Sequence, residues 1–179
     1  MCRLRVKLGA RDQVMQPKAI PIMLSMIPSV IRGVTPVGMV RIKQIVQASF
    51  PSVKQISAEE LSEWMKEPES TLIIDVRSPK EFGQSHLRGA INLRSAREIE
   101  QAMRDKKVSQ TVLYCAVGFR SSRVAAELTR HWPSIFNLEG SIFEWVNQGR
   151  PVFKNDLPTN DLHTFGKAWS GLVKPVADR

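Results

Sequence analysis

Short apolar runs alternate with amphipathic segments along the chain after residue 50. The apolar runs have the length and composition of buried strands, and the segments between them have helical periodicity. Strands and helices that alternate in this way are typical of βα units, in which helices cover both faces of a mainly parallel sheet. The pattern therefore predicts an α/β fold with a mainly parallel, five-stranded sheet. The expected strands are residues 53–56, 71–76, 89–93, 111–115 and 135–138.

Serine–glutamate pairs three residues apart mark the expected starts of four helices. In such a capping box, each side chain accepts a hydrogen bond from the backbone N–H of the other residue. The pairs are Ser57–Glu60, Ser78–Glu81, Ser95–Glu98 and Ser141–Glu144. A fifth helix is expected over residues 121–132, because Val124, Leu128 and Trp132 lie in one row of its surface.

The two ends of the chain differ from its middle. We expect residues 1–50 to be a basic N-terminal extension, either loosely ordered or a targeting segment, because they carry eight Lys/Arg but only one Asp. Residues 51–153 form the expected domain. Residues 154–179 form a tail, with a turn at Asn155–Asp156 and two aromatic residues, Phe165 and Trp169, that are expected to pack on the domain.

Charge and composition exclude several classes of function. The net charge of +9 comes mainly from residues 1–50, so no basic face for nucleic acid is expected on the domain. The most apolar stretch, residues 20–31, is too short to span a bilayer and contains two prolines. The two cysteines cannot form a disulfide framework, and no Cys/His cluster has the spacing of a zinc site. We expect no metal, no integral membrane segment and a cytoplasmic location, or an organellar one if residues 1–50 are a targeting segment.

Cys115 is the residue with the clearest chemical role. It ends a predicted central strand, and the carboxyl ends of such strands are where sites form in an α/β sheet. Gly118 permits a tight turn, after which the helix is expected to start at Arg120 or Ser121. The loop N–H groups, the helix N-terminus and the charge of Arg120 would together stabilise an anion. These surroundings favour a thiolate nucleophile over a cysteine that only packs in the core.

The segment around Cys115 resembles the active-site loop of the rhodanese family. "CAVGFRSSRVAAEL" (residues 115–128) is similar to a Cys-x-x-Gly-x-Arg-Ser pattern that opens a helix. "LIIDVRSPKEFGQSHLRGAINL" (72–93) and "NLEGSIFEWVNQGRPV" (137–152) resemble two further signatures of the family, so the resemblance covers about residues 53–153. Three positions depart from the usual pattern, which has Gly, Pro and Gly there: Ser85, Arg88 and Ser141.

The resemblance implies sulfur transfer that needs no metal or organic cofactor. Cys115 would take the outer sulfur of a small donor such as thiosulfate, hold it as a persulfide and pass it to a thiol, cyanide or a protein acceptor. The residues expected to bind the substrate are Ala116, Val117, Gly118, Phe119 and Arg120, with Asp75, Arg77 and Ser121 in supporting positions. A structural salt bridge is the favoured alternative role for Asp75 and Arg77, as is a structural hydrogen bond for His86 and a core position for Trp145.

Two other function classes stay open. Phosphatases and arsenate reductases of related fold have five residues between cysteine and arginine, whereas four separate Cys115 from Arg120, and the smaller ring suits one extra sulfur atom. A non-enzymatic sulfur carrier or regulatory module is the second alternative, although a regulatory module would typically lack the cysteine. The apolar side chains of Ala116, Val117 and Phe119 predict modest activity with thiosulfate and a larger or protein-bound partner.

Overall fold

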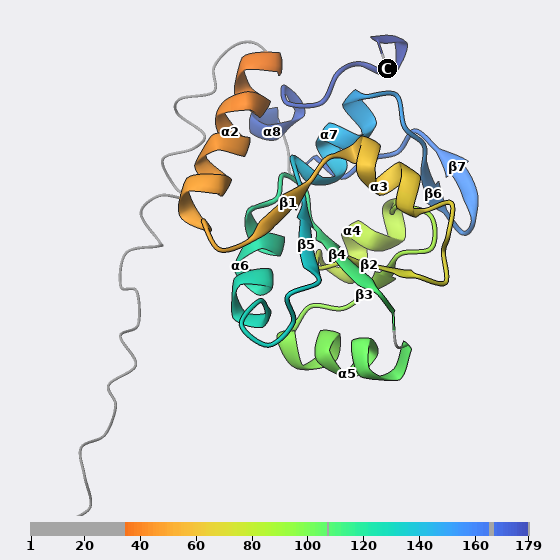
Figure 1. The fold of residues 1–179 in the computed structure, drawn as a ribbon. Helices are drawn as coiled ribbons and strands as arrows, with labels where there is room; N and C mark the ends of the chain where they lie inside the picture. Colours follow the sequence, from red (N-terminus) through yellow and green to blue (C-terminus); the bar gives the residue numbers. More distant parts are fainter. Residues whose placement is uncertain (1–34, 107, 165–166, 179) are drawn as a thin grey trace, which may run out of the picture. The chain divides into compact units, whose positions relative to one another are not determined.

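Five parallel strands form the central sheet of the structure, a computed structural model that describes residues 35–106, 108–164 and 167–178 (Figure 1). Their order across the sheet is β1-β5-β4-β2-β3, so β4 is the central strand. The predicted parallel five-stranded sheet is confirmed, and every strand lies within one or two residues of its expected range. The strands are β1 (Lys54–Ile56), β2 (Thr71–Asp75), β3 (Ile91–Asn92), β4 (Gln110–Tyr114) and β5 (Ile135–Leu138).

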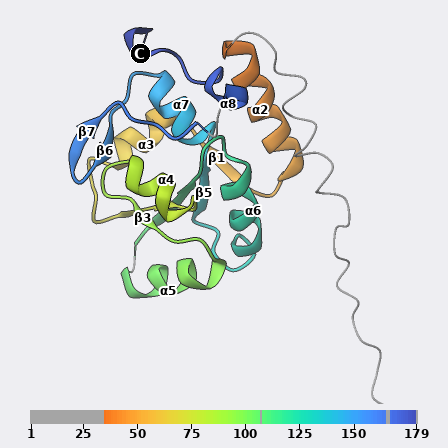
Figure 2. The ribbon, with the colours of Figure 1, turned by 180° about the vertical axis from the view of Figure 1, so that it is seen from behind.

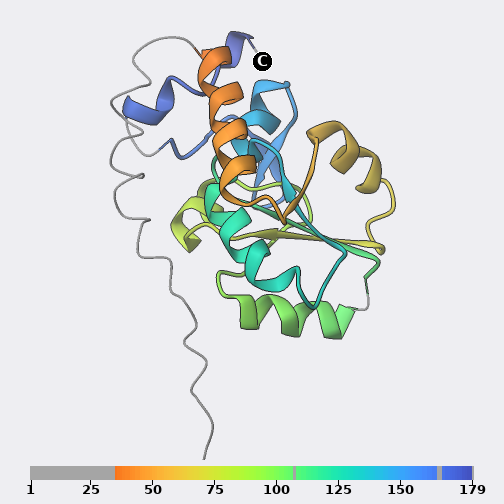
Figure 3. The same cartoon turned by 60° about the vertical axis from the view of Figure 1, so that its left-hand side comes forward.

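Helices cover both faces of this sheet, as the pattern predicts (Figure 3). Helices α5 and α6 pack on one face, while α3 and α7 contact each other on the opposite side. None of the helices in the described ranges is both long and apolar enough to cross a membrane. The helices are α2 (Thr35–Ser49), α3 (Ala58–Trp64), α4 (Pro79–Gln84), α5 (Ala96–Lys106), α6 (Phe119–Leu128), α7 (Ser141–Asn147) and α8 (Lys167–Ser170), and a 3₁₀ turn spans Val176–Asp178.

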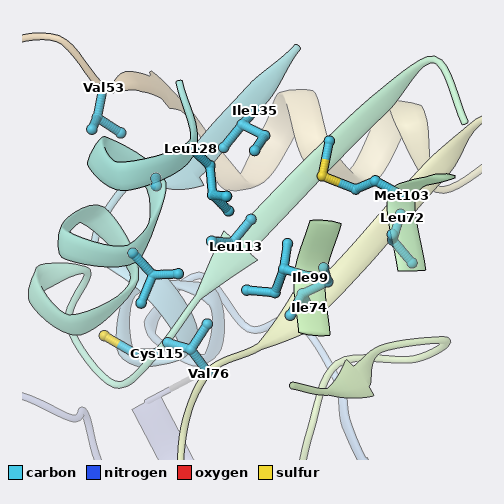
Figure 4. Packing of buried hydrophobic residues seen from close by; sticks show 12 residues of the cluster. Val53, Leu72, Ile74, Val76, Ile99, Met103, Leu113, Cys115, Leu128 and Ile135 are labelled. Atoms are coloured by element: carbon cyan, nitrogen blue, oxygen red, sulfur yellow. The ribbon is translucent and has the colours of Figure 1, made fainter. Parts of the chain in front are cut away.

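A buried apolar cluster fills the layer between the sheet and helices α5 and α6 (Figure 4). Side chains of a strand alternate between its two faces, so Leu113 and Cys115, two residues apart, both face this layer. Ile99 from α5 and Leu128 from α6 pack against them. Figure 4 shows Cys115 beside Val76 at one end of the cluster, where strands β2 and β4 end. Cys115 therefore packs against the core and lies at the carboxyl ends of the strands.

Three of the four predicted capping boxes are confirmed. Each of the pairs Ser57–Glu60, Ser78–Glu81 and Ser95–Glu98 makes both reciprocal hydrogen bonds at the start of its helix. The fourth prediction is wrong: Gly140 is the N-cap of α7, and Ser141 has a left-handed φ of +53°. The Ser141 hydroxyl instead accepts a hydrogen bond from the N–H of Cys115, so a contact distant in sequence replaces the local cap.

Helix α2 lies within the segment expected to be an extension, but it packs on the domain. Met39, Ile42 and Val46 are buried, and Lys43 forms an ion pair with Glu139, with 3.0 Å between Nζ and Oε2. The segment has no acidic residue in its first turn, and its apolar residues are not confined to one face, so its pattern did not indicate a helix. The possible targeting role of residues before 35 concerns a part of the chain outside the described residues.

The tail returns to the domain. Strands β6 (Val152–Lys154) and β7 (Leu157–Thr159) form an antiparallel hairpin, and the predicted turn is confirmed by positive φ angles at Asn155 and Asp156. Further along, Leu172 is fully buried and its carbonyl accepts a hydrogen bond from Asn147 of α7. Figures 1 and 2 show β6 and β7 side by side at the edge of the domain. Of the two aromatic residues expected to anchor the tail, Trp169 is only half-buried and Phe165 is outside the described residues.

Asp75 and Arg77 form a salt bridge that is completely buried. The Nη2 of Arg77 lies 2.6 Å from the Oδ2 of Asp75, and neither side chain is exposed. The same Nη2 donates to the carbonyl of Ser85, which ties the end of β2 to the end of α4. The attraction between the two charges offsets much of the cost of burying them, but removal of one partner leaves an uncompensated buried charge.

Asp75→Ala is therefore expected to lower the free energy of unfolding by about 3–5 kcal/mol, because it leaves Arg77 buried without its counter-ion. Urea unfolding followed by circular dichroism measures this loss. Glu63→Ala is the control, because the Glu63–Lys66 pair is exposed and its removal should cost less than about 1 kcal/mol. Equal losses in the two variants would contradict a structural role for the buried pair.

Candidate active site

Cys115 lies directly after the central strand β4, in the loop that leads to α6. The residue is only 1% exposed, and its sulfur accepts a hydrogen bond from the N–H of Gly118 at 3.2 Å. The structure places all the predicted residues from Cys115 to Ser121 in this loop and in the first turn of α6. Ala116 and Val117 are buried, whereas Phe119 and Arg120 are partly exposed at its outer side.

Gly118 makes the tight turn possible. Its φ is +99°, in the left-handed region that favours glycine, and a Cβ atom there would lie 3.2 Å from the side-chain nitrogen of Asn137. Gly118 is also the N-cap of α6, which begins at Phe119, one or two residues earlier than expected, and ends at Leu128, before the expected end at residue 132. No side chain caps this helix end, so the first N–H groups of α6 keep their positive potential for an anion.

Helix α7 fixes the other side of the loop. The N–H groups of Ile142 and Phe143 donate to the carbonyls of Cys115 and Ala116, at 3.3 and 3.1 Å. The Oγ of Ser141 accepts from the N–H of Cys115 at 3.1 Å. The loop carbonyls are thus occupied by α7, while the N–H of Gly118 is directed to the sulfur. Sequence reasoning missed Ser141 as a site residue. The sequence did offer one indication, because Ser141 stands at a position where the family usually has glycine.

A buried polar chain supports Ser121. Its hydroxyl donates to the Oδ1 of Asn137 at 2.5 Å, and the Nδ2 of Asn137 donates in turn to the Oε1 of Gln55 at 2.6 Å. Ser121 and Asn137 are completely buried. Asn137 was not predicted as a site residue, because it lies on β5 and comes close to the loop only through the sheet. These two hydrogen bonds link β1 and β5 to the first turn of α6.

The electrostatic surroundings of Cys115 favour its thiolate. Burial raises the pKa of the thiol, but the charge of Arg120 and the hydrogen bonds from Ser121 and Gly118 outweigh burial, so the pKa lies below its usual value. A thiolate, rather than a thiol, is the nucleophilic form of cysteine. At a given pH the site therefore holds a larger fraction of its sulfur as thiolate than an ordinary cysteine does.

Arg120 is held by a carboxylate that the sequence analysis assigned only to a helix cap. Its Nη2 lies 2.8 Å from the Oε1 of Glu81, and its Nη1 lies 3.2 Å from the Oε2. The two residues meet because α4 follows β2 and α6 follows β4, and the carboxyl ends of these paired parallel strands lie side by side. Burial raises the pKa of Glu81, but hydrogen bonds from Arg120 and Ser78 lower it to about 2, so the carboxylate is ionised at neutral pH.

The family model of the rhodanese-like domain matches residues 57–148, just over half of the chain. The chain belongs to the rhodanese-like domain family. The match includes β2 to β5 and the Cys115 loop, but it begins after α2 and ends before the β6–β7 hairpin. The predicted resemblance is thereby confirmed.

Similar proteins include enzymes of more than one kind. A sulfurtransferase from Allochromatium vinosum is 30% identical over 101 residues, which cover 56% of this chain and 94% of that protein. A tRNA uridine(34) hydroxylase from Lactococcus lactis is 32% identical over 104 residues, but this chain spans only 32% of its length. The crystal structure of a thiosulfate sulfurtransferase from Pseudomonas aeruginosa matches with a TM-score of 0.54 at 19% identity, over 63% of this chain and 22% of that one, which shows a common fold.

Within this rhodanese-like domain, several predicted residues have structural roles. Asp75 and Arg77 bond to each other, and Arg77 also donates to the carbonyl of Ser85, so both residues serve the structural role that was favoured for them. The ring of His86 pairs with the carbonyl of Phe82 at 3.0 Å, and Trp145 is buried, so both favoured structural interpretations are confirmed.

Beside Arg120, the outer side of the rhodanese-like site includes an apolar contact. Phe119 packs edge-on against Phe50, with 5.1 Å between the ring centroids. Phe50 directly follows helix α2 and precedes the residues that match the family model. A residue from outside the family match therefore contacts the loop that carries the cysteine.

Arg120→Ala is expected to raise the pKa of Cys115, because it removes the charge that stabilises the thiolate. A raised pKa leaves less thiolate at any pH below it, so alkylation by iodoacetamide at pH 7 should slow by about threefold or more, and the rate profile should move to higher pH. Arg123→Ala is the control, because Arg123 is an exposed arginine on the same helix. A profile that moves equally in both variants would reject the specific role of Arg120.

Proposed function

We propose that this protein is a sulfurtransferase that carries sulfane sulfur on Cys115 as a persulfide. The observation that supports the proposal most strongly is the buried sulfur of Cys115, which accepts the Gly118 N–H at the N-terminus of α6 and lies in the field of Arg120. Anionic sulfur is stabilised by such preorganised groups. Persulfides are also a known reversible state of reactive cysteines.

The proposed reaction has two displacement steps. In the first, the Cys115 thiolate attacks the outer sulfur of thiosulfate, the S–S bond of the donor breaks, and its electron pair leaves with sulfite. The negative Cys115 persulfide that results would be stabilised by the Gly118 N–H and the charge of Arg120. In the second step, a thiolate or cyanide attacks the terminal sulfur, and the electron pair of the breaking bond returns to Cys115 as the thiolate.

The surroundings of the loop favour a larger or protein-bound sulfur partner over a small inorganic anion. Ala116 and Val117 of the loop are apolar and buried, and the Phe119–Phe50 pair offers an apolar surface at its outer side. An apolar surface suits a thiol compound or a protein cysteine better than it suits a small inorganic anion. A free catalytic thiol also favours a reducing compartment such as the cytoplasm.

Intact mass spectrometry without reductant tests the persulfide directly. After incubation with thiosulfate, the protein is expected to gain one sulfur atom, about 32 Da, that cyanide removes. The chain has two cysteines, so Cys2→Ser should keep this gain and Cys115→Ser should lose it. A cyanide-labile gain that persists in Cys115→Ser would place the sulfur elsewhere and reject the mechanism. Absence of the gain with thiosulfate and with a small hydropersulfide would reject the function.

A further inference from the structure

Glu81 has an unusual number of roles for a helix-capping residue. Its side chain is 5% exposed, and its Oε2 accepts hydrogen bonds from the N–H and the hydroxyl of Ser78, as a capping residue does. The same carboxylate accepts two hydrogen bonds from the guanidinium of Arg120. A helix cap needs only the first set of contacts, as Glu98 shows with Ser95 at α5.

The Glu81–Arg120 pair changes the charge that a ligand of Cys115 experiences. Arg120 is the cation whose charge acts on the sulfur, and the adjacent ionised Glu81 offsets that charge at longer range. Together with the thiolate, the three groups carry one net negative charge. A thiosulfate dianion would therefore approach a site that is negative overall, whereas a hydropersulfide with an uncharged R group is neutral as R–S–SH and carries one charge as R–S–S⁻.

We propose that Glu81 determines specificity in this site: by pairing with Arg120 it makes Cys115 favour a sulfur donor of low charge, an organic or protein hydropersulfide, over dianionic thiosulfate. This inference rests on the proposed function. In the step that it favours, the Cys115 thiolate attacks the outer sulfur of R–S–SH, the S–S bond breaks, and R–S⁻ leaves as Cys115–S–SH forms. The charge is conserved, and no further reactant is required.

The apolar contacts of the loop agree with this donor class. The rings of Phe119 and Phe50 can contact the organic part of a hydropersulfide, but they have no hydrogen-bond donor for the oxygens of thiosulfate. Selectivity for one ligand over another depends on the difference between their binding free energies. The negative charge of Glu81 weakens the binding of thiosulfate, and the apolar contact strengthens the binding of a hydropersulfide, so both increase the preference for the hydropersulfide.

Charge selection at Cys115 is measured without any sulfur transfer by comparing iodoacetate, an anion, with iodoacetamide, its neutral analogue. Both reagents alkylate the same thiolate, so the ratio of their rates does not depend on the thiolate fraction. Glu81→Gln keeps the shape and a capping oxygen but removes the charge, and it should raise the iodoacetate-to-iodoacetamide ratio by about tenfold at low salt, with a smaller rise at high salt. Glu98→Gln, which removes the charge of a matched capping box on α5, should leave the ratio unchanged.

Two further variants keep the test decisive if Glu81→Gln alters the loop. Arg120→Gln should lower the ratio, and the double variant Glu81→Gln/Arg120→Gln, in which the pair is neutral again, should return it close to the wild-type value. A rise in Glu81→Gln, a fall in Arg120→Gln and a return in the double variant are expected together only if the two opposite charges offset each other at the ligand. An unchanged ratio in Glu81→Gln, or an equal rise in Glu98→Gln, would overturn the proposal.

The rates of sulfur loading distinguish this proposal from the proposed function. Wild type should take sulfur faster from 2-hydroxyethyl hydropersulfide, which has no other charged group, than from thiosulfate, and Glu81→Gln should reduce that preference by about tenfold. No loading from either donor, together with the expected alkylation ratios, would reject sulfur transfer but support charge selection by Glu81. Loading with a preference that Glu81→Gln leaves unchanged would support sulfur transfer and overturn the role of Glu81.

Discussion

The hydrogen bond from the Gly118 N–H to the sulfur of Cys115 is the interaction on which the site depends. A buried N–H group needs an acceptor, and at this turn the acceptor is a side chain that can itself carry a negative charge. The bond requires the left-handed conformation of Gly118, which in turn sets the start of α6. One short turn thus positions a nucleophile, aligns a helix terminus with it and brings Arg120 within its field.

The surrounding elements make this turn rigid by occupying its other polar groups. Helix α7 takes the carbonyls of Cys115 and Ala116, and Ser141 takes the N–H of Cys115. On the opposite side, Ser121 is fixed through Asn137. Preorganisation of this kind avoids the cost of reorienting dipoles when charge moves during a reaction. The rhodanese-like fold supplies it because loops that follow neighbouring parallel strands meet at one edge of the sheet.

The features that could be predicted from the sequence are those encoded locally. The strands, the caps at Ser57, Ser78 and Ser95, and the loop at Cys115 each follow from residues within a few positions of one another. The features that were missed depend on partners far along the chain. Ser141 looked like a cap because Glu144 is three residues away, yet its actual partner, Cys115, is 26 residues distant. Glu81 and Arg120 are 39 residues apart, and only the pairing of β2 with β4 brings them together.

Helix α2 also shows that the segment defined by family resemblance is not the whole folding unit. Met39, Ile42 and Val46 bury their side chains against the domain, and Phe50 continues that contact to the ring of Phe119. A protease cut between α2 and β1 would remove these apolar residues and expose the surfaces that they cover on the rest of the domain. Such surfaces attract other chains, so a shortened protein would be more prone to aggregate as well as less stable. Loss of helix α2 and Phe50 would for this reason also change the surroundings of Phe119, at the outer side of the Cys115 loop.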